Sequence, residues 1–162
     1  MYRRLEILFL ASMFCFLVGR AWSGSAPQNT HKPPGAAVST LVIPRLERAP
    51  ALEEFLSMQP TGDIAPRMMK VTGFLQRNPH DGQPASQRTE AYLGYDAKNL
   101  YAVFVCFDDP SKVRARMSRR EDIFSDDSVE IMLDTFHDQR RAYAFQTNPL
   151  GVQWDAIWTQ SS

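Results

Sequence analysis

The chain has 162 residues and 18 basic and 18 acidic side chains, so its formal net charge is zero. This length suits one domain of ordinary size. A balanced charge produces no broad electrostatic field that would attract nucleic acid or an acidic membrane. The chain contains two cysteines, Cys15 and Cys106, which is too few for a disulfide-rich scaffold. We therefore expect a fold held together by an apolar core, with no nucleic-acid partner.

Residues 1–23 have the pattern of a cleaved export signal. Two arginines near the N-terminus precede a 12-residue apolar run, Ile7–Val18, and small residues follow at Ala21 and Ser23. Twelve apolar residues are too few to span a bilayer, which needs about 20. We expect export and cleavage, no transmembrane helix in the mature chain, and a free Cys106 buried in the core. Retention as a single membrane anchor is the alternative.

Residues 24–40 are rich in Pro, Gly, Ser and Ala without periodicity, which is typical of a linker. Residues 41–162 are then the folded domain. Leu41–Pro44 is a candidate edge strand, because Pro44 lacks the N–H that a ladder needs. Apolar residues at helical spacing in Ala51–Met58 predict one short amphipathic helix.

Six apolar or alternating runs bounded by turn residues predict strands: Met68–Gln76, Arg88–Tyr95, Leu100–Phe107, Val129–Phe136, Ala142–Asn148 and Gly151–Thr159. Asp96–Asn99 and Pro149–Gly151 are predicted hairpin turns. Leu100–Phe107 is apolar on both faces, which predicts a central strand between two layers. The pattern favours an all-β fold, an antiparallel β-sandwich resembling a jelly roll.

The last predicted strand is followed by only three residues, Gln160–Ser162. Six strands are few for two packed sheets, and unpaired sheet edges promote aggregation. We therefore expect the sandwich to be incomplete at its C-terminal side, and the chain to be the N-terminal part of a longer protein.

Charged residues gather in the loop before the fourth predicted strand. Arg119 and Arg120 lie beside Glu121 and Asp122, and such neighbouring donors and acceptors suit sugar hydroxyls. Asp126 and Asp127 follow shortly after, and acidic oxygens so close together are candidate Ca²⁺ ligands. The alternative is a solvated loop whose internal ion pairs contribute less than about 1 kcal/mol each.

Trp154, Ala156 and Trp158 share one face of the last predicted strand, because side chains alternate along a strand. The two indole rings would stand roughly 13 Å apart. They are candidates for a platform on which sugar rings stack, and the alternative is that they belong to the core. No Ser/His/Asp order and no zinc-ligand spacing is apparent.

Five motifs in order resemble the family-9 carbohydrate-binding modules: TEAYLGYD at Thr89–Asp96, NLYAVF at Asn99–Phe104, RED at Arg120–Asp122, DDSVEIMLD at Asp126–Asp134 and NPLG at Asn148–Gly151. The run Gly73–Pro79 is similar to a version of this module in bacterial exported proteins. In those proteins the module is N-terminal and precedes a predicted outer-membrane barrel.

The resemblance implies a sugar-binding β-sandwich, often attached to xylan-degrading and other glycoside hydrolases, with Ca²⁺ in some members. At matching positions it implies that Glu90 hydrogen-bonds sugar hydroxyls, together with Arg120 and either Glu121 or Asp122. With the two tryptophans, the candidate carbohydrate-binding residues are Glu90, Arg120, Asp122, Trp154 and Trp158.

Three hypotheses follow. The first is an exported, non-catalytic module that binds oligo- or polysaccharide of the xylan or cellulose type and serves its breakdown or uptake. Its location would be the periplasm, the outer membrane or the exterior. The second is a periplasmic interaction domain that docks onto its own C-terminal outer-membrane barrel and binds no sugar. The third is part of a glycoside hydrolase, for which Glu90 and Asp122 are a conceivable pair of acids.

Overall fold

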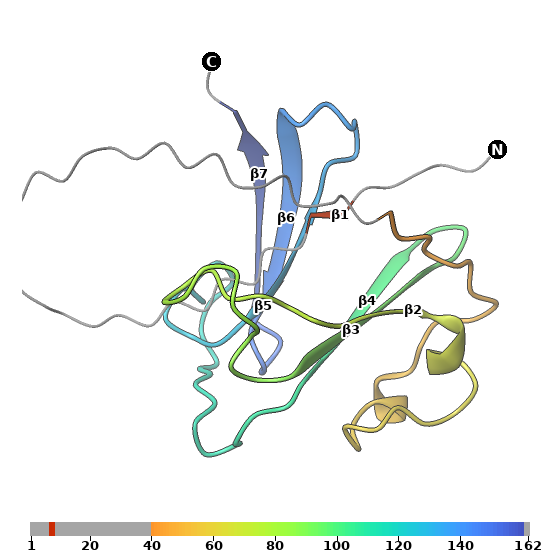
Figure 1. Ribbon diagram of the computed structural model, residues 1–162, viewed down its shortest axis with the longest axis horizontal. Coiled ribbons are helices and arrows are strands. Elements are labelled where there is room, and N and C mark those ends of the chain that lie inside the picture. The colour runs from red at the N-terminus through yellow and green to blue at the C-terminus, as the bar shows by residue number, and fades with distance from the viewer. Residues whose placement is uncertain (1–6, 9–39, 161–162) are drawn as a thin grey trace, which may run out of the picture.

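The computed structural model describes residues 7–8 and 40–160, and there the fold is all-β, as predicted (Figure 1). One antiparallel sheet has the order β2-β3-β4, formed by Met69–Val71, Thr89–Tyr95 and Leu100–Cys106. The other has the order β1-β5-β6-β7, formed by Ile7–Leu8, Val129–Leu133, Arg141–Thr147 and Gln153–Thr159. The two sheets diverge in Figure 1, so the sandwich is open on one side.

The predicted signal peptide (1–23) and linker (24–40) lie outside the described residues, apart from Ile7–Leu8 and Thr40. Ile7 and Leu8 pair with Leu133 and Met132 of β5. Within the described part of the chain, no helix has the length and apolar character to cross a membrane.

The β3–β4 hairpin is closed by the predicted turn at Asp96–Asn99. The Asp96 carboxylate accepts the N–H groups of Lys98 and Asn99, each at 2.7 Å, and the Tyr101 hydroxyl donates to the same carboxylate at 2.7 Å. These bonds satisfy the turn's backbone locally, which is the usual reason for Asp at this position. Seven residue pairs then run from Tyr95–Leu100 to Thr89–Cys106.

Asn148 organises the second predicted hairpin, between β6 and β7. Its Oδ1 accepts the N–H groups of Leu150 at 3.0 Å and Val152 at 2.9 Å, and its Nδ2 donates to the Arg116 carbonyl at 2.9 Å. Gly151 has φ of +82°, which glycine adopts without strain. Asn148 is 3% exposed, so its amide fixes both the turn and the neighbouring loop.

The main core lies on one face of the β2-β3-β4 sheet. The buried residues come from this sheet and from the segments that precede it: Leu46, Phe55, Ile64, Ala65, Met68, Tyr92 and Val105. The ring centroids of Phe55 and Tyr92 lie 5.4 Å apart with the rings edge to face. The opposite face of the sheet carries Ala91 and Leu93, which are fully buried, and is turned toward the second sheet.

The structure corrects the helix predicted over Ala51–Met58. A single 3₁₀ turn forms at Leu52–Glu54, because only Phe55 reaches the core. Leu52 and Leu56 are each 66% exposed. Two of the three apolar residues that suggested an amphipathic helix therefore have no surface to pack against.

Two further expectations about Leu100–Cys106 are wrong. This strand, β4, lies at the edge of its sheet, and β3 is the central strand. Both of its faces are apolar because one contributes to the main core and the other faces the second sheet. Cys106 ends the strand and is exposed rather than buried.

Candidate functional site

A hollow of about 590 Å³ lies between the two sheets. Its floor is apolar and comes from β4, β5 and β6, whereas the polar groups come from the end of β6, from β7 and from the loop before β5. The apolar side chains are Leu100, Ala102, Phe104, Val129, Ile131, Leu133 and Phe145. The hollow is also lined by Arg120, Gln146, Thr147, Gln153, Trp154 and Asp155.

Arg120 is held against β7 by three acceptors. Its Nη1 donates to Gln153 Oε1 at 3.1 Å, its Nη2 donates to Asp155 Oδ1, and its Nε donates to Glu121 Oε1 at 3.3 Å. Gln153 and Asp155 are two residues apart, so their side chains leave the same face of β7. The bond to Asp155 is the main reason that the pKa of Arg120 is raised. Arg120 is therefore a fixed cation at the rim of the hollow.

The loop that carries Arg120 passes around the edge of β7. The Glu121 N–H donates to the Gln153 carbonyl at 3.0 Å, so the loop is attached to the free side of the strand. On the other face of β7, the rings of Phe124 and Trp154 meet edge to face with centroids 5.6 Å apart. Arg120 and Phe124 thus hold β7 from opposite faces. We call residues 119–127 the clasp loop.

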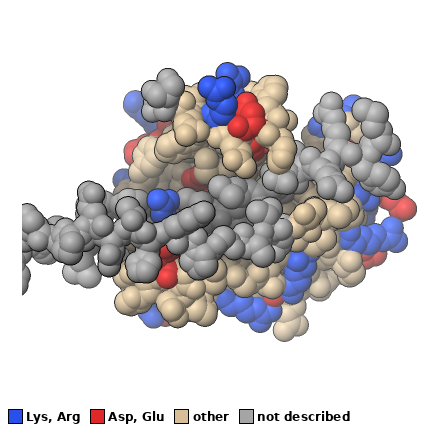
Figure 2. All heavy atoms as spheres, turned by 45° about the horizontal axis from the view of Figure 1, so that its top comes forward, with Lys and Arg blue, Asp and Glu red and all other residues tan. Residues whose placement is uncertain are grey.

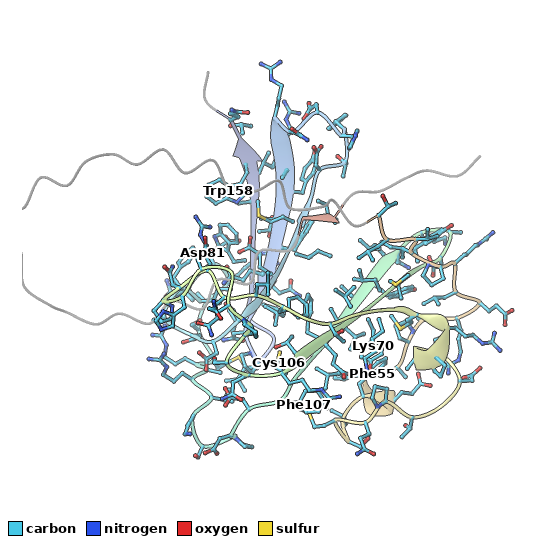
Figure 3. All side chains as sticks on the ribbon, viewed as in Figure 1. Phe55, Lys70, Asp81, Cys106, Phe107 and Trp158 are labelled. Carbon is cyan, nitrogen blue, oxygen red and sulfur yellow. The ribbon has the colours of Figure 1, made fainter. Side chains whose placement is uncertain are left out.

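Trp154 and Trp158 share the outer face of β7, as the alternation predicts. Trp158 is 56% exposed, and in Figure 3 it projects from β7 on the side turned away from β3 and β4. Trp158 is therefore not a core residue. Trp154 is half-buried, packs against Phe124 and borders the hollow at the start of the strand.

Beside Trp154, the same outer face carries Gln146 and Glu130, which lie opposite one another in the register of β5, β6 and β7. The Gln146 amide donates to the Ser128 hydroxyl at 2.5 Å. Burial raises the pKa of the Glu130 carboxyl. Among the described residues, no side chain forms an ion pair with Glu130.

Glu90 lies on β3 in the other sheet and faces the main core, where it is 2% exposed. Its Oε1 accepts from Lys70 at 2.8 Å and from Arg88, and its Oε2 accepts from the Tyr92 hydroxyl at 2.7 Å. Burial raises the pKa of Glu90, but the hydrogen bonds from Lys70, Tyr92 and Arg88 outweigh it and lower the pKa to about 2. Lys70 and Phe55 in Figure 3 mark this region. Both carboxylate oxygens of Glu90 thus already bind protein donors.

Asp126 and Asp127 bind the chain itself. Asp126 accepts from Arg116 Nε and from Asn148 Nδ2, each at 2.9 Å, and Asp127 accepts the Arg114 N–H at 2.8 Å. A Ca²⁺ site needs six to eight oxygen ligands, whereas these oxygens face N–H groups. Within the residues that the structure describes, no three His, Cys, Asp or Glu side chains gather as a metal site. The residues present therefore do not fit a bound Ca²⁺.

The structure thus brings two of the predicted sugar-binding residues together, Arg120 and Trp154, at the β7 end of the hollow. Asp122 is exposed on the clasp loop, 3.9 Å from Arg116 Nη2, and Trp158 lies further along β7. Glu90 belongs to the other sheet.

Sequence reasoning missed Gln153, Asp155 and Phe124. Gln153 and Asp155 flank Trp154, so the alternation that placed the tryptophans also places a carboxylate and an amide on the opposite face. The alternation along the last predicted strand could therefore have identified Gln153 and Asp155. The contact with Phe124 depends on the path of the clasp loop, which no local pattern reveals.

On the face drawn in Figure 2, basic and acidic side chains are interspersed over the described residues. No extended patch of one sign forms there. Comparisons with protein-family models, with curated proteins and with solved structures find no match for the chain.

Proposed function

We propose that the chain is a non-catalytic carbohydrate-binding module that binds sugar at the β7 end of the hollow. The observation that supports it best is the pairing of Arg120 with Asp155 and Gln153 beside Trp154. Sugar hydroxyls need donors and acceptors side by side, together with an aromatic surface for their C–H bonds. Arg120, Gln153 and Asp155 supply the donors and acceptors, and the ring of Trp154 also lines the hollow that they border.

The donors and acceptors at this site have capacity left for a ligand. A guanidinium has five N–H bonds, and Arg120 uses three of them on described residues. Asp155 accepts through Oδ1, and its Oδ2 receives no hydrogen bond from the described residues. Each hydrogen bond from a charged group to a sugar hydroxyl contributes about 1.5–3 kcal/mol.

The hollow has a size suitable for a small oligosaccharide. Its volume of about 590 Å³ falls within the range of roughly 300–1,000 Å³ typical of small-molecule sites. The resemblance to family-9 modules agrees with this reading and directs it toward xylan- or cellulose-type glycans. We accordingly place the module outside the cytoplasm, in the periplasm, at the outer membrane or in the secreted fraction, where it would serve polysaccharide breakdown or uptake.

The test is isothermal titration of the folded chain with xylo- and cello-oligosaccharides. We expect saturable heat with a Kd of about 1 μM to 1 mM, which corresponds to roughly 4–8 kcal/mol. Arg120→Ala and Trp154→Ala should each weaken binding about tenfold or more. Arg77→Ala, which removes an exposed arginine from another loop, is the matched control and should bind as the parent does. No heat from a folded sample would refute the proposal.

The apolar floor of the hollow favours a second candidate, an interaction domain without sugar binding that docks onto an outer-membrane barrel. Aliphatic side chains from β4 and β5 suit polypeptide side chains better than they suit sugar hydroxyls. Glycoside hydrolysis has less support, because both carboxylate oxygens of Glu90 bind Lys70, Arg88 and Tyr92.

A further inference from the structure

The free edge of β7 is a continuous backbone surface that no described strand covers. β7 is the last strand of its sheet and pairs with β6 on one side. The Gln153 carbonyl accepts the Glu121 N–H, so it points away from β6. Because N–H and C=O of one residue point to the same side of a strand, Asp155, Ile157 and Thr159 also present theirs to the free side.

Beyond the clasp loop at Gln153 and the charge of Asp155, this edge lacks the features that usually protect exposed strands. Natural edges carry Lys, Pro or a bulge that prevents pairing, and Gln153–Thr159 contains no Lys, Pro or Gly. Its side chains include two large exposed apolar groups, Ile157 at 59% and Trp158 at 56%. The neighbouring Phe145 on β6 is 48% exposed. The edge is therefore open both in its backbone and in its side chains.

We propose that this edge binds a second copy of the chain, with the two β7 strands antiparallel and Ile157 on the two-fold axis. The clasp loop occupies the edge at Gln153, and β7 ends at Thr159. The β7 residues whose outward N–H and C=O groups no described residue covers are thus Asp155, Ile157 and Thr159, and the central one is Ile157. Two-fold pairing is self-complementary, so one such edge is sufficient to form a closed dimer.

The side chains match in this register. Ile157 lies beside its own copy and continues the apolar row begun by Tyr143, its neighbour on β6. On the outer face, each Trp158 lies opposite Ala156 of the other copy, so a large side chain meets a small one. These pairs bury the two residues of β7 that are most exposed and apolar, which is the main driving force for association.

The charges also match. Asp155 lies opposite Thr159 of the other copy, and Thr159 pairs with Arg141 on β6. Arg141 and Asp155 of the other copy then share a face at two strand spacings, about 10 Å between Cα atoms. An arginine side chain can cover much of that distance. No two β7 residues of like charge lie directly opposite each other in this register. Shifting the axis to Ala156 would place Asp155 opposite Ile157, so the register centred on Ile157 is preferred.

Disulfide trapping in the full chain tests the register, with Cys15→Ser and Cys106→Ser as background. In a hydrogen-bonded antiparallel pair the Cα atoms lie about 5.5 Å apart, which a disulfide can bridge. Ile157→Cys should therefore form a covalent dimer under mild oxidation. Thr159→Cys should not, because its copies lie about 13 Å apart along the strand. Equal linkage of both variants, or linkage of neither, would overturn the register.

Light scattering after gel filtration, over a range of concentrations, tests the association itself. We expect a dimer for the parent chain. Ile157→Lys should raise its dissociation constant at least about tenfold, because an edge lysine opposes strand pairing. Leu75→Lys is the matched control, since Leu75 is 58% exposed and lies outside β7. It should remain dimeric. The proposal would be refuted if the parent chain were monomeric at every concentration. This holds even if the monomer bound a strand of another protein.

Discussion

The two sheets differ in how completely their side chains are covered. On β3, Glu90, Ala91, Tyr92 and Leu93 are at most 5% exposed. On β7, at the far side of the other sheet, Ile157 and Trp158 are more than half exposed. The charged groups differ between the sheets in the same way. Both carboxylate oxygens of Glu90 bind protein donors, whereas Arg120 and Asp155 still have N–H groups and an oxygen that can bind a ligand. We infer that the β2-β3-β4 sheet supplies most of the stability, and that the β7 end is the part available to ligands and partners.

The largest difference in stability between the two regions is expected from truncating one isoleucine in the main core and one on β7. Ile64 is fully buried in the main core and Ile157 is 59% exposed. Ile64→Ala should lower the free energy of unfolding by about 2–5 kcal/mol, through lost burial and a cavity. Ile157→Ala should change it by less than about 0.5 kcal/mol. Urea unfolding followed by tryptophan fluorescence at low protein concentration measures both, and similar losses would contradict the proposed division.

Substitution of Gly94 on β3 should have the next largest effect on the free energy of unfolding. A Cβ on Gly94 would lie 2.5 Å from Leu46 Cδ1 and 2.8 Å from its Cγ, and Leu46 is itself 4% exposed. Gly94→Ala should therefore destabilise the domain by about 1–3 kcal/mol by overpacking. Gly82→Ala tests φ strain instead, since open space surrounds its Cβ and its φ is +77°. Leu46→Ala is itself destabilising, so a smaller cost of Gly94→Ala in the Leu46→Ala background than in the parent chain would identify the clash as the cause.

Acid titration tests the Glu90 network. Its pKa is lowered from 4.5 to about 2 in the folded chain. Its stabilising effect is therefore complete above about pH 4.5 and is lost as pH falls toward 2. Glu90→Gln should cost about 1–3 kcal/mol at pH 7, and the difference from the parent should shrink between pH 4.5 and 2. A difference that stays constant over this interval would show that Glu90 stabilises the fold by packing rather than by charge.

A small effect on stability is also expected at the proposed sugar site. Arg120 and Asp155 are both exposed, with side-chain exposures of 60% and 45%. Asp155→Asn should therefore change the free energy of unfolding by less than about 1 kcal/mol. It should still weaken sugar binding several-fold, because the amide holds the guanidinium less firmly. Thermal unfolding measures the stability of the variant, and calorimetric titration of the same sample measures its sugar binding. Loss of stability without loss of binding would assign Asp155 to the fold alone.

The existence of the six strands in residues 68–159 could be predicted from the sequence because each is a run of apolar or alternating residues between turn formers. The first of them is shorter than predicted, since β2 ends at Val71 and not at Gln76. The arrangement of the strands into sheets could not be predicted, because alternation does not show which strand occupies the edge. This is why β4 was expected at the centre. For the same reason the sequence could not show that Glu90 and Arg120 lie in different places. Both belong to recognisable motifs, but Glu90 lies on β3 and Arg120 contacts β7. The helix predicted at Ala51–Met58 does not form, because Leu52 and Leu56 are exposed. The periodicity of a sequence cannot show whether such side chains have a surface to pack against.

The Asp96 turn has a consequence for the order of folding. It joins β3 and β4 through four residues, and its carboxylate holds two backbone N–H groups and Tyr101. Short loops close with little loss of entropy, and local contacts form early. Strands β5, β6 and β7 follow only after the long segment 107–128, so their docking requires a larger loop closure. We expect the β3–β4 hairpin to serve as the nucleus, with the clasp loop settling on β7 in the last steps.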